Sequence, residues 1–161
     1  HEAEAVSYGR VGSELDIRDR LHTFVSNLKR AAERATDQDV TLLVEPVNLL
    51  DNPGYFLSDI DMARHVIEMV GSDHVGLQLD FYHRQVMRGD LATAIRDNLD
   101  ITRHIQIANP PDRADPRSGE INYDYIFAEL EELGYGGWIG CEYTPLGTTA
   151  ESLGWFEKYR N

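Results

Sequence analysis

Four oxygen-bearing side chains each follow a short apolar run in this sequence: Glu45, Asp80, Gln106 and Glu142. The intervals between them are 35, 26 and 36 residues, each about the length of one strand–helix unit. If the runs are parallel strands, the four side chains meet at the rim of the sheet where α/β folds place their active sites. Carboxylates brought together there repel one another and resist ionising as a group. A divalent cation removes that conflict, and an all-oxygen set predicts Mg²⁺ or Mn²⁺ as cofactor.

One histidine can join this rim. His83 lies three residues beyond Asp80, in a segment expected to be a loop. A histidine in that position either faces the site or is an ordinary loop residue, and the sequence leaves both interpretations open.

The elements that must position these side chains alternate along the chain. Apolar residues at helical spacing, together with capping residues, predict helices over 14–35 with Ser13 as N-cap, from Ser58 to Gly71, from Asp90 to Leu99, from Asn122 to Gly134, and after Thr148 or Thr149. Strands are expected over 41–48 (ending near Glu45), 75–80, 104–109 and 138–143. One helix followed by four strand–helix units indicates an α/β fold with a parallel sheet. We expect a single domain over 1–161, with residues 1–12 irregular.

The length and the net charge of the chain exclude several classes of protein. A complete eight-stranded barrel needs about 200–250 residues, whereas this chain has 161. The formal net charge is −13, from 15 basic and 28 acidic side chains. This argues against nucleic acid and anionic membranes as partners, because phosphate contacts need a basic face. No apolar run has the roughly 20 residues of a membrane span. The single cysteine, Cys141, favours a reducing, cytoplasmic location.

Several segments together resemble a known family. LLVEPVN, NPGYFLSD, LQLDFYH, HIQIAN, SGEINYDYIF and GWIGCEY are similar, in order and spacing, to the hydroxypyruvate isomerase family of xylose-isomerase-like TIM barrels. The similarity runs from about residue 14 to 159. It covers the last four βα units of the barrel and the preceding helix, so the expected architecture is a parallel (β/α) half barrel.

The resemblance implies roles for particular residues. A divalent metal would be held by Glu45, Asp80, Gln106 and Glu142, and the two glutamates would also donate and accept the proton. His83 would face the substrate, and Arg113 would bind a carboxylate, which a guanidinium can grip with two parallel hydrogen bonds. Asp51 and Glu120 are weaker candidates for the same site.

The implied reaction converts hydroxypyruvate into tartronate semialdehyde through an enediolate, so the partner is a small hydroxy-oxo acid. A sugar-acid isomerase, a keto-sugar 3-epimerase and a non-catalytic half barrel are the alternatives. The related endonuclease IV is disfavoured, because it would need several histidine ligands and a basic groove. A half barrel also leaves two open sheet edges and an apolar inner face, which predicts self-association or pairing with a missing N-terminal half.

Overall fold

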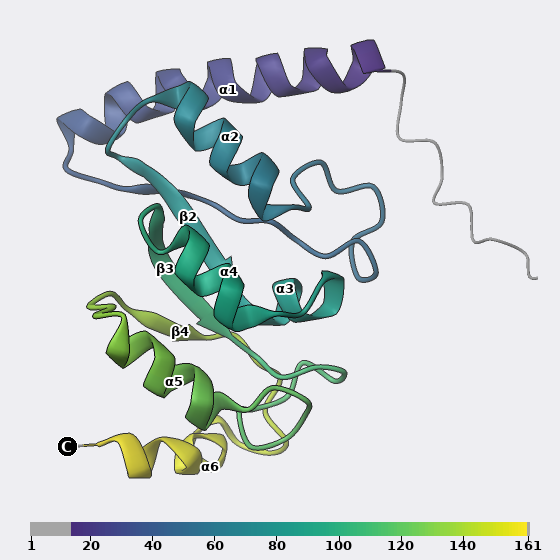
Figure 1. The fold of residues 1–161 in the computed structure, drawn as a ribbon, viewed down its shortest axis with the longest axis vertical. Helices are drawn as coiled ribbons and strands as arrows, with labels where there is room; N and C mark the ends of the chain where they lie inside the picture. The colour runs from purple at the N-terminus through teal and green to yellow at the C-terminus, as the bar shows by residue number, and fades with distance from the viewer. Residues whose placement is uncertain (1–13, 161) are drawn as a thin grey trace, which may run out of the picture.

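The computed structural model describes residues 14–160 and shows one four-stranded parallel sheet. The strands lie in chain order, β1-β2-β3-β4, and pair in parallel throughout. Figure 1 shows the units following one another from α1 at one end of the molecule to α6 at the other. The predicted α/β half-barrel class is confirmed. The strands are β1 (Leu42–Val44), β2 (Val75–Asp80), β3 (Thr102–Ile107) and β4 (Ile139–Cys141).

Six α-helices and a short 3₁₀ helix accompany the sheet within the described residues. They are α1 (Glu14–Asp37), α2 (Ile60–Val70), α3 (Phe81–Met87), α4 (Leu91–Asn98), α5 (Tyr123–Glu132), α6 (Thr149–Ser152) and η1 (Leu153–Tyr159). The predicted Ser13 cap and the irregular segment 1–12 lie outside the described residues.

Helix ends follow the capping residues, with one correction. Asp59, not Ser58, is the N-cap of α2, because its Oδ1 accepts a hydrogen bond from the backbone N–H of Asp61 at 2.8 Å. Gly71 ends α2 in the left-handed region, at φ 66°, which a glycine adopts without steric cost. Thr148 forms a capping box at the start of α6.

The helix α3 was not predicted, and it places His83 in a helix rather than in a loop. Strand β2 runs into α3 without an intervening residue. Asp80, the last strand residue, caps the helix by accepting from the backbone N–H of Tyr82 at 2.8 Å. Seven residues are too few for apolar periodicity to reveal a helix, so the cap was the only local signal.

The two faces of the sheet differ in character. Alternate strand residues such as Leu77, Leu79 and Ile105 are fully buried in the core beneath the helices. The residues between them, including Gln78 and Gln106, face the opposite side and are only half-buried. The expectation of an apolar inner face is therefore wrong over the two central strands, where this face is polar.

The sheet is open at both sides within residues 14–160, since β1 pairs only with β2 and β4 only with β3. In the same part of the chain, no helix combines the length and the apolar character needed to cross a bilayer.

Candidate active site

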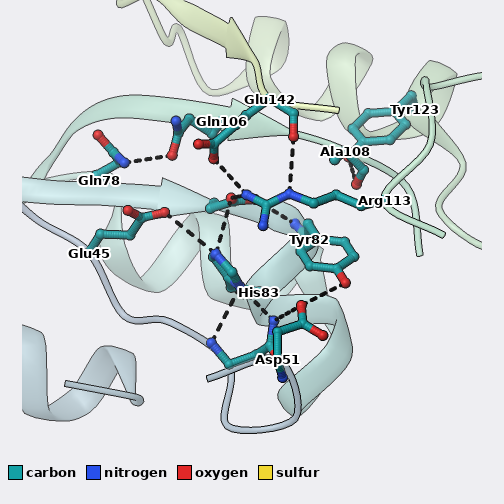
Figure 2. Close-up of polar contacts among 12 residues, drawn as sticks. Glu45, Asp51, Gln78, Tyr82, His83, Gln106, Ala108, Arg113, Tyr123 and Glu142 are labelled. Atoms are coloured by element: carbon teal, nitrogen blue, oxygen red, sulfur yellow. Dashed lines mark hydrogen bonds and ion pairs between the residues drawn. The ribbon is translucent and has the colours of Figure 1, made fainter. Parts of the chain in front are cut away.

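The strand register gathers the predicted rim residues. Asp80 of β2 is the direct partner of Gln106 in β3, and Gln106 is the partner of Gly140 in β4. Glu142 directly follows β4, and its backbone N–H donates to the carbonyl of Ile107 at 3.1 Å. Glu45 directly follows β1. Figure 2 shows the ends of Glu45, Gln106 and Glu142 turned toward a common space beside His83.

His83 closes this space from α3. Its side chain is only 5% exposed, and its Nε2 lies 3.8 Å from Oε1 of Glu45 and 3.7 Å from Oδ2 of Asp80. One atom from each of these three residues falls within 4.8 Å of the others, a spacing that could hold a metal ion. Glu142 is not part of this three-residue group, and its carboxylate pairs with Arg113.

Two buried carboxylate oxygens are left without a hydrogen-bond partner, although charged groups lie 3.7 to 3.8 Å away. Oε1 of Glu45 and Oδ2 of Asp80 are inaccessible to solvent and accept no hydrogen bond. Burial raises the pKa of Glu45 to about 7, with repulsion from Asp80 and Glu142 as the next causes. Burial likewise raises the pKa of Asp80 to about 6. The expected conflict between carboxylates is present, but loss of solvation contributes more to it than mutual repulsion. Buried oxygens of this kind, without a hydrogen-bond donor, fit a divalent cation.

The side-chain amide of Gln106 is hydrogen-bonded to the side-chain amide of Gln78. The Nε2 of Gln78 donates to Oε1 of Gln106 at 2.5 Å, which orients the amide that was predicted to be a ligand. A carbonyl oxygen has two lone pairs, so this hydrogen bond leaves one for a cation. Gln78 was not among the residues predicted from the sequence. It lies two residues before Asp80, and the two-residue period of a strand could have found it.

Arg113 is held in place by its backbone and by an aromatic ring. Its φ of 52° is unusual for a residue other than glycine, and its carbonyl accepts from the backbone N–H of Thr144 at 2.8 Å. The guanidinium donates from Nη2 to Oε2 of Glu142 at 2.8 Å and from Nε to the carbonyl of Glu142 at 3.2 Å. It also lies 4.8 Å from the ring centre of Tyr82 and 3.7 Å from Oδ2 of Asp80. In the sequence, nothing indicated the contact between Arg113 and Glu142.

Behind His83 lies a buried polar network. Asn48, which is fully buried, contacts the Nδ1 of His83 through both its backbone N–H and its side-chain amide. Asp51 accepts from Asn48 at 2.9 Å and from the hydroxyl of Tyr82 at 2.8 Å, and these two bonds lower the pKa of Asp51. Figure 2 shows the network beneath the rim. Asp51 thus supports His83 from behind. Asn48 was not predicted, since its partner is 35 residues away.

Glu120, the other weaker candidate, lies on the exposed surface. Its Oε1 accepts from Nε2 of Gln85 in α3 at 3.3 Å. Glu120 thus contacts α3 and is not part of the group formed by Glu45, Asp80 and His83.

Fold and site together define the class of this protein. The family model of the xylose isomerase-like TIM barrel matches residues 4–159. The chain therefore belongs to the xylose isomerase-like TIM barrel family.

Particular relatives within the family are isomerases by name. A 2-oxo-tetronate isomerase of Cupriavidus necator is 41% identical over 154 residues, which cover 96% of this chain and 59% of the relative. The hydroxypyruvate isomerase of Escherichia coli is 42% identical over 143 residues, covering 88% of this chain and 55% of the relative. A crystal structure of an AP endonuclease, family 2, from Brucella melitensis superposes with a TM-score of 0.87 at 42% identity. That match covers 92% of this chain and 58% of the other. The chain thus spans little more than half the length of these relatives.

Proposed function

We propose that this chain carries the catalytic centre of a metal-dependent isomerase that interconverts hydroxypyruvate and tartronate semialdehyde through an enediolate. The observation that carries the proposal is the pair of unpartnered buried oxygens of Glu45 and Asp80, next to His83 and in the same space as Glu142. The names of the two sequence relatives described above support the same class of reaction.

The ligand set would be Glu45, Asp80, Gln106 and Glu142. A divalent cation bound there would supply positive charge to the carbonyl and hydroxyl oxygens of the substrate and to the enediolate. The residues themselves fit this task, because three offer carboxylate oxygens and the fourth an amide oxygen. Mg²⁺ and Mn²⁺ both prefer such ligands.

Proton transfer is assigned to the two glutamates. Glu45 and Glu142 come from the two outer strands of the sheet, so they approach a flat intermediate from different sides. One removes the proton from the carbon that bears the hydroxyl group. The other returns a proton to the former carbonyl carbon or serves the oxygens, where the hydroxyl proton passes to the former carbonyl oxygen.

Arg113 and His83 would bind the substrate. The hydrogen bonds of Arg113 within the described residues use its Nε and Nη2, so its Nη1 can meet the carboxylate of a hydroxy-oxo acid. His83 would face the substrate oxygens from α3. The net charge of −13 makes the rest of the chain a poor surface for nucleic acid, so a small acid is the proposed partner.

A second substrate is favoured by one specific observation. The relative from Cupriavidus necator is named a 2-oxo-tetronate isomerase, and it matches this chain about as well as the hydroxypyruvate isomerase does. The same site could shift the carbonyl of a longer sugar acid, since the chemistry at the first carbons is unchanged.

The open edges of β1 and β4 lead to a proposal about assembly. We propose that they pair with further βα units, either from a second copy of this chain or from an N-terminal half of the barrel. Light scattering of the purified protein measures this directly. A stable dimer supports self-association, whereas a monomer of 18.3 kDa would contradict it.

An isomerase assay tests the function. The purified protein is treated with a chelator and assayed on hydroxypyruvate and on 2-oxo-tetronate, with and without added Mg²⁺ or Mn²⁺. Turnover that the chelator removes and the metal restores supports the proposal, and the better substrate decides between the two acids. A folded protein that turns over neither acid with either metal would contradict it.

A further inference from the structure

Asn48 holds His83 by two contacts to the same ring nitrogen. The backbone N–H of Asn48 lies 3.3 Å from Nδ1 of His83, and the side-chain Nδ2 lies 2.7 Å from it. A backbone N–H can only donate a hydrogen bond, so Nδ1 must be the acceptor. Both residues are buried, at 0% and 5% exposure, so water does not replace these contacts.

The orientation of the Asn48 amide is determined independently of the histidine. Its Oδ1 accepts from the backbone N–H of Asp51 at 2.8 Å, while its Nδ2 donates to Oδ2 of Asp51 at 2.9 Å. The reversed amide would set its oxygen against that carboxylate and its NH₂ against that N–H. The amide therefore presents a second donor to Nδ1 of His83. The hydroxyl of Tyr82 binds the same Oδ2 at 2.8 Å and fixes Asp51 in turn.

From this geometry, and resting on the proposed function, we propose that Asn48 is a positioning residue that fixes the tautomer of His83. A neutral imidazole has one donor and one acceptor nitrogen, so an accepting Nδ1 places the proton on Nε2. That N–H faces Oε1 of Glu45 and Oδ2 of Asp80 at 3.8 and 3.7 Å, too far for a direct hydrogen bond.

The tautomer decides what His83 does in the site. A histidine binds a metal through an unprotonated nitrogen, and here the nitrogen that faces the carboxylates carries the proton. His83 therefore donates a hydrogen bond to an oxygen of the substrate, although its distance alone would allow it to be a ligand. Only the oxygen ligands then bind the cation, and His83 binds the substrate. Asn48 determines this assignment through the tautomer of His83, without contacting the substrate.

Nuclear magnetic resonance of ¹⁵N-histidine-labelled protein tests the proposal. Two-bond ¹H–¹⁵N spectra distinguish a protonated from an unprotonated ring nitrogen, and His83→Gln identifies the signals of His83 among the six histidines. We expect a protonated Nε2 and an unprotonated Nδ1, both in chelator and with excess Mg²⁺. A proton on Nδ1, or loss of the Nε2 proton on adding Mg²⁺, would overturn the proposal.

Two variants sharpen the result. In Asn48→Asp a charged oxygen replaces the side-chain donor at the shorter contact of 2.7 Å, while the backbone N–H stays at 3.3 Å. The carboxylate should outweigh the backbone N–H, so the ring should turn to the tautomer protonated on Nδ1. An unchanged spectrum in this variant would show that the side chain of Asn48 does not set the tautomer. If Asn48→Asp does not fold, the spectrum of the unmodified protein still decides. Tyr82→Phe is the matched control, because it removes a bond of the same network but leaves both Asn48 contacts, and it should keep the proton on Nε2.

The test is separate from that of the proposed function, because it needs no substrate. An inactive protein with its proton on Nε2 would overturn the function alone, whereas an active protein with its proton on Nδ1 would overturn only the role of Asn48.

Discussion

Asp80 of β2 and Gln106 of β3 are direct partners in the parallel register of the sheet. This pairing sets a carboxylate beside an amide at the rim. The bulge between Leu77 and Gln78 shifts the register just before it. Because side chains alternate between the faces of a strand, a shift of one residue would turn Gln106 toward the helices. The register of two strands thus determines which side chains are available to a cation.

Removing the acid–base function of Glu142 should abolish most of the turnover. Glu142→Gln keeps an oxygen that can accept from Arg113 but cannot exchange a proton at the reacting carbons. We expect kcat to fall by about 100- to 10,000-fold, measured with saturating substrate and Mg²⁺. Glu132→Gln, an exposed change on α5, is the control and should leave kcat unchanged. Near-normal isomerisation by Glu142→Gln would show that the role of Glu142 is wrongly assigned.

Asp80 should be required for metal binding. Asp80→Asn keeps Oδ1, which caps α3, but replaces the unpartnered Oδ2 with a neutral NH₂ group. Titration calorimetry with Mn²⁺ should show at least about a tenfold loss of affinity, which corresponds to about 1.4 kcal/mol. Asp100→Asn removes an exposed carboxylate paired with Arg64 and should bind as the unmodified protein does. Equal affinity in the two variants would argue against a metal ligand at Asp80.

Glu45 should make the stability of the metal-free protein depend on pH. Its pKa is raised to about 7 in the folded chain, so the folded state holds a proton that the unfolded state releases from about pH 4.5 upward. This contribution to the free energy of unfolding is present at low pH and is lost as the pH rises to about 7. Glu45→Gln removes it. In chelator, the variant should therefore gain in melting temperature relative to the unmodified protein between pH 5 and pH 8. Each kcal/mol corresponds to about 2–4 °C.

The comparison between the two proteins also cancels the contribution of His83. Burial lowers the pKa of His83 to about 4, which acts in the opposite direction between pH 4 and 6.5 but is present in both proteins. A difference in melting temperature that stays constant from pH 5 to pH 8 would contradict the raised pKa of Glu45.

Arg113 should govern the affinity for the acidic substrate. Arg113→Gln removes the charge that would bind the substrate carboxylate, so KM should rise by about 10- to 100-fold, in keeping with about 1.5–3 kcal/mol for a hydrogen bond to a charged group. Arg117→Gln is the matched control from the same loop, because Arg117 pairs with Asp115 instead. If the two variants have the same KM, the substrate carboxylate binds elsewhere.

Much of the rim could be predicted because the signals were local. Glu45, Asp80 and Glu142 each follow or end a short apolar run in the sequence, and parallel pairing then places them together. The same reasoning could not find the ion pair between Arg113 and Glu142. This contact depends on the left-handed backbone conformation of Arg113 within a long loop. It also could not find Asn48, because only the tertiary structure brings Nδ1 of His83 into contact with this residue.

The helix α3 shows a different limit. Its seven residues carry too little periodicity to be recognised, so His83 was expected in a loop. A carboxylate that ends a strand and caps the next helix has the same sequence appearance as one that simply precedes a turn. Only the hydrogen bond that the backbone N–H of Tyr82 donates to Asp80 distinguishes the two.

The direct junction between β2 and α3 restricts which sequence changes this chain can accept during evolution. A helix turns by about 100° for each residue, so one amino acid inserted after Asp80 would swing the imidazole of His83 away from the rim and out of reach of Asn48. Elsewhere, surface loops can absorb such length changes. Between β2 and α3 no loop residue is available to absorb a change in length. We therefore expect related sequences to differ there by substitutions but not by insertions or deletions.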